Sequence, residues 1–108
     1  MTRDELDKAL PKVVQRLRDA LEMECVYLYG SAAASPEGPC NDLDVLVVIP
    51  KSDLNFFDRT AVAYRALRQI GVPVDVQVYT REEFDSRSAL PVSFERTVRN
   101  KGKIVYAA

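Results

Sequence analysis

The fold of this chain is decided by the stretch VYLYGS at residues 26–31 and by DLDVLVV at residues 42–48, which follows after ten intervening residues. The first is a β-favouring run that ends in a turn at Gly30, and the second is aliphatic enough for a strand covered on both faces. Asp42 and Asp44 are two residues apart, so they point to the same side of an extended chain. Mg²⁺ prefers carboxylate oxygens and takes its remaining ligands from water and substrate phosphates. The pair therefore indicates a phosphoryl or nucleotidyl transfer site.

A third acidic residue, Asp75, lies in the run VDVQVY at residues 74–79, where valines alternate with more polar residues. Such a period of two predicts a strand that presents Asp75 on its more polar face. Asp75 is either a strand-edge carboxylate that faces water or a third metal ligand, and we favour the ligand. The alternative for Asp42 and Asp44 is a turn-forming Asp followed by one satisfied by backbone N–H groups.

Gly30 and Ser31 form the second half of the candidate site. Glycine lets the backbone turn tightly, so that N–H groups and the Ser31 hydroxyl can hold a triphosphate. The alternative is an ordinary strand-to-helix turn with a serine cap.

The combination of Gly-Ser, a ten-residue gap, Asp-x-Asp and a later strand Asp resembles the minimal nucleotidyltransferases of the DNA polymerase beta superfamily. The likeness extends through the closing stretch from Phe94 to Tyr106. It implies an α/β fold, with a small mixed β-sheet flanked by helices, as one polymerase-beta-like nucleotidyltransferase domain over residues 1–108. The chain departs from the family at Ala34-Ser35, where many relatives have Arg-Gly, and at Asn41, where many have Ser.

The resemblance also implies the roles of the site residues. Asp42, Asp44 and Asp75 are expected to be catalytic and to bind Mg²⁺ or Mn²⁺, and Gly30 and Ser31 to bind the nucleotide, with ATP as substrate. Asp42 and Asp44 would hold the ion on the nucleotide phosphates, and Asp75 would help to hold a second ion beside the attacking hydroxyl. The implied reaction is nucleotidyl transfer to a hydroxyl with release of pyrophosphate.

The expected biological role follows from the same resemblance. Minimal members are typically encoded with a separate helical protein of the HEPN family, and several such pairs are toxin–antitoxin systems in which AMP is added to a tyrosine of the toxin. We therefore expect an antitoxin with a helical HEPN-type partner that covers an apolar surface of this chain. Two alternatives stay open: a non-catalytic binding module that neutralises the partner by complex formation, and a small-molecule nucleotidyltransferase of the aminoglycoside-modifying kind.

Composition excludes several other classes. The chain has 108 residues and a net charge of −1, so it lacks the basic footprint that duplex nucleic acid requires. It has no histidine, which excludes Ser-His-Asp catalysis and most zinc sites. No apolar run reaches the length of a membrane span, and the N-terminus has no signal-peptide core, so we expect a cytoplasmic protein. Cys25 and Cys40 are interpreted as a buried residue and an incidental loop thiol.

The remaining elements are predicted from periodicity and caps. Leucines and valines at helical spacing predict a helical region from a Thr2 cap to Leu21, in which Pro11 either kinks the helix or lies in its first turn. The further expectations are a loop over residues 35–41, a helix capped by Ser52 or Asp53 and running to Ile70, a helix start at Thr80, a helix over residues 91–100 with Pro91 in its first turn, and a strand over residues 103–106.

Overall fold

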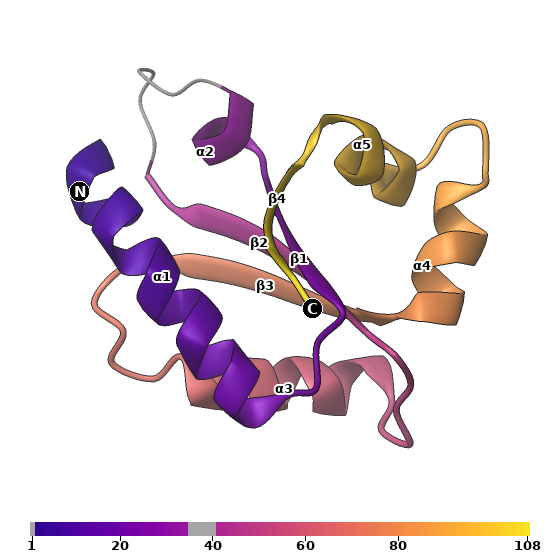
Figure 1. The fold of residues 1–108 in the computed structure, drawn as a ribbon, viewed down its shortest axis with the longest axis horizontal. Helices are drawn as coiled ribbons and strands as arrows, with labels where there is room; N and C mark the ends of the chain where they lie inside the picture. Colours follow the sequence, from indigo (N-terminus) through magenta and orange to yellow (C-terminus); the bar gives the residue numbers. More distant parts are fainter. Residues whose placement is uncertain (1, 35–40) are drawn as a thin grey trace.

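The computed structural model describes residues 2–34 and 41–108, which form a four-stranded sheet and five helices (Figure 1). In chain order the elements are α1 (Arg3–Ala20), β1 (Cys25–Tyr29), α2 (Ser31–Ala34), β2 (Leu43–Ile49), α3 (Phe56–Ala66), β3 (Val74–Thr80), α4 (Arg81–Ser88), α5 (Phe94–Lys101) and β4 (Lys103–Ala107). Apart from Asn41, the loop expected over residues 35–41 lies outside the described residues, and so does Cys40.

The sheet is mixed, with the strand order β3-β2-β1-β4. β1 runs antiparallel to both β2 and β4, whereas β2 and β3 are parallel. The predicted α/β class, with a small mixed sheet flanked by helices, is therefore confirmed. The register places Asp44 opposite Asp75 on one side and opposite Tyr29 on the other.

Helices cover both faces of the sheet because side chains alternate along each strand. One face carries the valines and leucines that pack against α1 and α3, including Val26, Val45 and Val76. The other face packs against α4 and α5 through a cluster that includes Leu46 and Phe84. Figure 1 shows α1 and α3 on one side of the sheet and α4 and α5 on the other.

The first helix has the predicted extent, but Pro11 does not lie in its first turn. α1 is one 18-residue helix that starts at the Thr2 cap, whose side chain accepts a hydrogen bond from the backbone N–H of Glu5. Pro11 lies inside it, so the first-turn interpretation was wrong. Proline removes one backbone hydrogen bond at that point, but the buried side chains of Leu6, Val13 and Leu17 hold the helix against the sheet.

The start and the end of α3 also differ from the prediction. α3 is capped by Asn55, not by Ser52 or Asp53, and it ends at Ala66 rather than at residue 70. The side chain of Ser52 instead accepts a hydrogen bond from the backbone N–H of Leu54 at 3.0 Å, so it forms a local turn before the helix. None of the helices in the described part of the chain is long and apolar enough to cross a membrane.

The end of the chain shows one confirmation and one correction. Thr80 caps α4 in a reciprocal capping box with Glu83, as the Thr-x-x-Glu spacing predicts. α5 begins at Phe94 with Ser93 as its cap, so Pro91 precedes the helix and does not lie in its first turn. A serine accepts the free N–H groups of a first turn, which a proline cannot do, and it therefore sets the start.

Candidate functional site

The candidate site lies where β1, β2 and β3 bring three side chains into a row. Asp44 is paired with Asp75 across the parallel strands and with Tyr29 across the antiparallel ones. Paired residues point to the same face, so all three lie on the face that α4 and α5 cover. Asp42 lies in the bend just before β2, half-buried, whereas Asp75 is exposed at the edge strand.

Asp44 is the acidic residue of this row whose carboxylate form is disfavoured by its surroundings. Burial raises the pKa of its carboxyl, and the negative charges of Asp42 and Asp75 raise it further. Within the described residues, no hydrogen bond or basic side chain offsets these effects. Two of the carboxylates that the sequence singled out, Asp42 and Asp75, are therefore within electrostatic reach of the third, Asp44.

Gly30 is required at its position by both backbone and space. Its φ of 72° lies in the left-handed region, which disfavours a side chain. A Cβ atom added there would overlap a carboxylate oxygen of Asp44. The turn and the acidic pair, which are separate motifs in the sequence, are thus in direct contact, and the exposed Ser31 begins α2 beside them.

Tyr64 of α3 joins the site, although sequence reasoning did not select it. Its hydroxyl donates to Oδ1 of Asp75 at 3.0 Å and accepts from the backbone N–H of Val76 at 3.1 Å. Burial raises the pKa of Tyr64, and Asp75 and Asp44 raise it further, so the hydroxyl keeps its proton at neutral pH. In the sequence Tyr64 directly follows Ala63, which is buried in the core, and nothing local marks it as part of the site.

A chain of hydrogen-bonded polar side chains begins at Tyr29 and leads along the same face of the sheet to Glu95. The Tyr29 hydroxyl lies 3.3 Å from Nε2 of Gln77, and the Tyr79 hydroxyl lies 3.2 Å from Oε1 of Gln77 and 2.8 Å from Oε2 of the buried Glu95. Burial raises the pKa of Tyr29 to about 12, and the neighbouring carboxylates add to the effect. The phenol of Tyr29 therefore keeps its proton at neutral pH, and its oxygen accepts a hydrogen bond from Gln77.

An apolar hollow of about 340 Å³ adjoins the row between β1, α2 and α5. The ring of Phe94 meets the ring of Tyr29 edge-on, with 5.2 Å between centroids. Lys101 brings a positive charge to the hollow, and Gly30 forms part of its wall. The hollow is therefore continuous with the turn that contacts Asp44.

The donor set suits a hard divalent cation. Among the residues that the structure describes, no three acidic, cysteine or histidine side chains stand as a ready-formed metal cluster. Asp42, Asp44 and Asp75 nevertheless offer carboxylate oxygens only, which is the chemistry that Mg²⁺ and Mn²⁺ bind. Their mutual repulsion at Asp44 is what a cation relieves, so the residues present fit such an ion.

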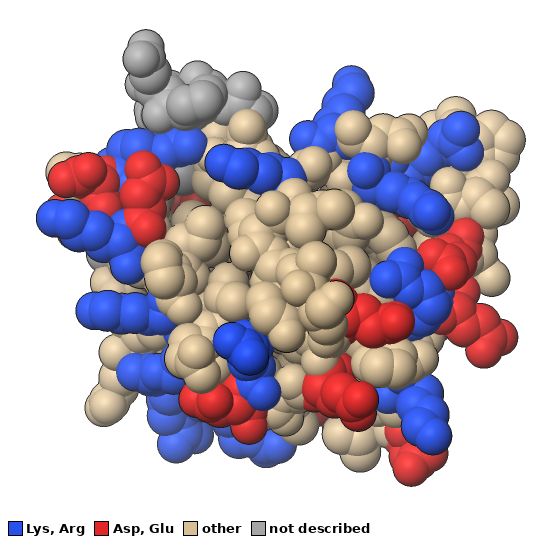
Figure 2. Space-filling view, viewed as in Figure 1, with Lys and Arg blue, Asp and Glu red and all other residues tan. Residues whose placement is uncertain are grey.

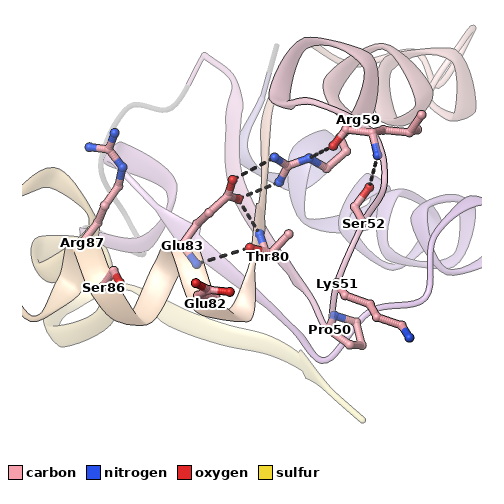
Figure 3. A pocket seen from close by; sticks show the side chains of 10 residues that line it. Pro50, Lys51, Ser52, Arg59, Thr80, Glu82, Glu83, Ser86 and Arg87 are labelled. Carbon is pink, nitrogen blue, oxygen red and sulfur yellow. Dashed lines mark hydrogen bonds and ion pairs between the residues drawn. The ribbon is translucent and has the colours of Figure 1, made fainter.

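A larger hollow, of about 570 Å³, lies at the other end of β2 and β3 and has a different character (Figure 3). There the guanidinium of the buried Arg59 meets both carboxylate oxygens of Glu83, at 2.7 and 2.9 Å. Arg59 also donates to the carbonyls of Leu54 and Val78, at 3.1 and 3.3 Å. Its donors are used within the protein, so size alone does not make this hollow the reactive site.

Surface charge offers no continuous basic area on the face seen in Figure 2. Acidic and basic side chains lie around the rim, and an uncharged area occupies the middle, over β4. A groove of about 430 Å³ between α1 and β4 lies there, and its wall includes Ile104. This face is suited to an apolar contact rather than to a phosphate backbone.

Comparisons with known proteins agree with this geometry. The sequence matches the family described as a nucleotidyltransferase domain over residues 10–105. The fold is similar to the crystal structure of a proposed nucleotidyltransferase from Sulfolobus solfataricus, with a TM-score of 0.66 and 22% sequence identity over 97% of this chain and 83% of that one. At this identity the likeness shows the fold. A search of curated proteins finds no match.

Proposed function

Since this chain belongs to the nucleotidyltransferase domain family, whose general activity is nucleotidyl transfer, we propose that it transfers AMP from ATP to a hydroxyl with the help of Mg²⁺ or Mn²⁺. Asp42, Asp44 and Asp75 would hold the ions. The observation that carries the proposal is the pairing of Asp44 with Asp75 beside Gly30, where burial and the charges of Asp42 and Asp75 raise the pKa of Asp44. Perturbed carboxylates of this kind are concentrated at reactive sites.

Each residue of the site has a distinct task in this reaction. When bound, divalent cations neutralise charge on the attacking and leaving oxygens of an in-line displacement. Asp42 and Asp44 supply oxygens on the buried side of the site. The exposed Asp75 lies toward the acceptor and is placed to take up the acceptor's proton.

The phosphates are proposed to lie along the Gly30 turn. The lack of a side chain at Gly30 lets a ligand approach the backbone, and the Ser31 hydroxyl adds a donor. Many relatives carry an arginine where this chain has Ala34. Lys101, which lines the hollow shared with Gly30, offers a positive charge on the same side of the site.

For the acceptor we propose a tyrosine of a helical HEPN-type partner toxin, which makes the chain an antitoxin. Large apolar side chains support a protein partner: Phe57 is 82% exposed and Val92 is 93% exposed. β4 is an edge strand with an exposed Ile104, which adds a second surface for contact. The same surfaces favour the alternative role, in which the chain neutralises the partner by binding alone.

The test is to mix the purified chain, the partner, each nucleoside triphosphate and Mg²⁺ or Mn²⁺, and to measure the mass of both proteins. We expect the partner to gain the mass of AMP, and Asp44→Asn and Asp75→Asn to abolish the gain while complex formation persists. Asp53→Asn is the matched control, because Asp53 is an exposed acid outside the candidate site. A partner that is silenced at equal stoichiometry yet never gains mass would favour the binding role instead.

A further inference from the structure

The Tyr64 hydroxyl lies where an acceptor hydroxyl would lie. The proposed reaction needs a hydroxyl beside Asp75, and the chain already places one there, 3.0 Å from Oδ1 of Asp75. Tyr64 is 43% exposed, so its ring is open to solvent and to a bound ligand. The acceptor class that the proposed function invokes, a phenolic hydroxyl, is thus present within the chain itself.

Two contacts fix the oxygen of Tyr64. It donates its proton to Asp75 and accepts the backbone N–H of Val76 at 3.1 Å, which leaves a further lone pair on the oxygen. Holding a nucleophile at two points is the kind of positioning that lowers the entropic part of a reaction barrier.

The bond to Val76 alone has a simpler explanation. Val76 lies on the edge strand β3, and a tyrosine hydroxyl that caps a free N–H stabilises such an edge. The second bond, to Asp75, is not needed for that purpose. It directs the phenol toward the acidic residues Asp75 and Asp44.

The other tyrosines of the chain lack this combination of exposure and contact. Tyr27 and Tyr79 are buried. Tyr29 is half-buried and bonded to Gln77. Tyr106 lies on β4, at the opposite edge of the sheet from β3.

We propose that Tyr64 is a self-modification site, and that the chain transfers a nucleoside monophosphate to its own Tyr64 hydroxyl; this rests on the proposed function. The Tyr64 oxygen forms a bond to the α-phosphorus of a nucleoside triphosphate, and the bond from that phosphorus to the α,β-bridging oxygen breaks. The electron pair leaves with pyrophosphate, and the hydroxyl proton passes to Asp75. The product is a phosphodiester on Tyr64.

Self-modification has a consequence for the site. The attached nucleotide removes the proton that Tyr64 donates to Asp75 and places a bulky group beside that carboxylate. A modified chain should therefore transfer to outside acceptors more slowly than a fresh chain. Modification should also stop at one nucleotide per chain, since Tyr64 is the one tyrosine of the described residues whose hydroxyl is hydrogen-bonded to Asp75.

The first test is intact-mass measurement of the whole chain after incubation with ATP, GTP, CTP or UTP and Mn²⁺, followed by peptide mapping. We expect a gain of one nucleoside monophosphate located on Tyr64, and no gain for Tyr64→Phe or for Asp44→Asn. Tyr106→Phe removes the same oxygen atom from a tyrosine of the opposite sheet edge and should be modified like wild type. A gain that maps to another residue, or that persists in Tyr64→Phe, overturns the inference.

A second test reads the position of Tyr64 without any transfer. Terbium(III) takes hard-cation sites and emits when a nearby tyrosine absorbs light, and the chain has no tryptophan to compete. We expect Tyr64→Phe to lower this emission clearly and Tyr106→Phe to leave it unchanged. Equal emission from wild type and Tyr64→Phe would place the phenol away from the ion and overturn the inference.

The proposed function is tested separately, by measuring whether AMP is transferred to the helical partner protein. If the partner gains AMP while Tyr64 stays unmodified, the self-modification inference fails and the proposed function stands. If neither protein is modified with any nucleotide, both fail.

Discussion

The two ends of the parallel pair β2–β3 carry opposite arrangements of charge. Where the strands begin, Asp44 and Asp75 face each other with the same sign. Where they end, Arg59 and Glu83 meet with opposite signs and two-point geometry. The first end concentrates negative charge, whereas at the second end the charge of Glu83 is neutralised by Arg59. The difference indicates that one end is kept for a ligand and the other for stability.

The pKa values express the same contrast. The ion pair with Arg59 lowers the pKa of Glu83 to about 2, whereas burial beside two other carboxylates raises the pKa of Asp44. A group with a lowered acidic pKa stabilises the folded chain near neutral pH, and a group with a raised acidic pKa destabilises it. The carboxylate row is therefore a cost to folding that a cation would relieve.

The largest expected effect is at the carboxylate row. Asp44→Asn keeps the volume but removes a ligand charge, and we expect nucleotidyl transfer to fall by about 10²–10³-fold, as when one electrostatic contact to a transition state is lost. The melting temperature should rise, because the repulsion with Asp42 and Asp75 is relieved. Transfer assays and thermal unfolding of the same preparations measure both quantities.

Loss of activity with a lowered melting temperature would contradict this account, since it would mean that Asp44 is a structural residue. Asp53→Asn, at an exposed position, should change neither quantity. The comparison between the two ends would be broken if Asp44→Asn and Arg59→Met affected stability in the same direction.

At the opposite end, Arg59→Met should lower stability without touching the site. The substitution leaves the Glu83 carboxylate and the carbonyls of Leu54 and Val78 without their donor. Breaking a fully buried pair costs about 3–5 kcal/mol, and because Glu83 is partly solvated we expect about 2–3 kcal/mol. Urea unfolding measures the loss, with Arg65→Met, an exposed arginine of the same helix, as control.

A third change separates backbone strain from contact with Asp44. Gly30→Ala should cost about 1–2 kcal/mol for its left-handed backbone, and it should also weaken metal-dependent nucleotide binding, because the added Cβ displaces the Asp44 carboxylate. Gly71→Ala is a matched control, since Gly71 has a φ of 91° and nothing within 4 Å of its added Cβ. The two variants should lose similar stability, and only Gly30→Ala should lose binding. Equal binding by both would show that the Gly30–Asp44 contact is unimportant.

The carboxylate end was readable from the sequence because its signals are local. A tight turn at Gly30, an aliphatic strand after Asp42 and a period-two strand around Asp75 each need only a few neighbouring residues. The parallel pairing that sets Asp44 opposite Asp75 is a long-range feature, and its register is seen in the structure alone. The structure leaves the metal and nucleotide roles of these residues as predictions.

Tyr64 and the Arg59–Glu83 pair were not readable, because both depend on how α3 lies against β3. Arg59 is 24 residues from Glu83 and Tyr64 is 11 residues from Asp75. An arginine in a helix pattern is usually a surface residue, and nothing nearby in the sequence marks Arg59 as buried. The predicted start of α3 was wrong for a different reason. Ser52 and Asn55 are both good helix caps, and local preference does not choose between them.

The smallest predicted effect compares the two ends by acid titration of stability. Glu83 has a folded pKa of about 2 against an ordinary value of 4.5, so its contribution is full above the ordinary value and is lost as pH falls toward 2. Asp44 has a raised pKa, so the folded chain gains stability when acid protonates it. Glu83→Gln should therefore reduce the stability that is lost between pH 4.5 and pH 2 by about 1 kcal/mol, a small value because the carboxylate is partly exposed. Asp44→Asn should increase the stability that is lost over the same range, because the variant no longer gains stability when acid protonates Asp44.

Urea unfolding at steps from pH 7 to pH 2 measures both slopes on the same scale. Glu82→Gln is the control for Glu83→Gln, because Glu82 is an exposed acid in the same turn of α4. Opposite changes of slope in the two test variants would show that acid strengthens one end of the β2–β3 pair while it weakens the other. If both variants ran parallel to wild type, neither carboxylate would change its proton affinity on folding. The contrast between the Asp44–Asp75 end and the Arg59–Glu83 end would then rest on geometry alone.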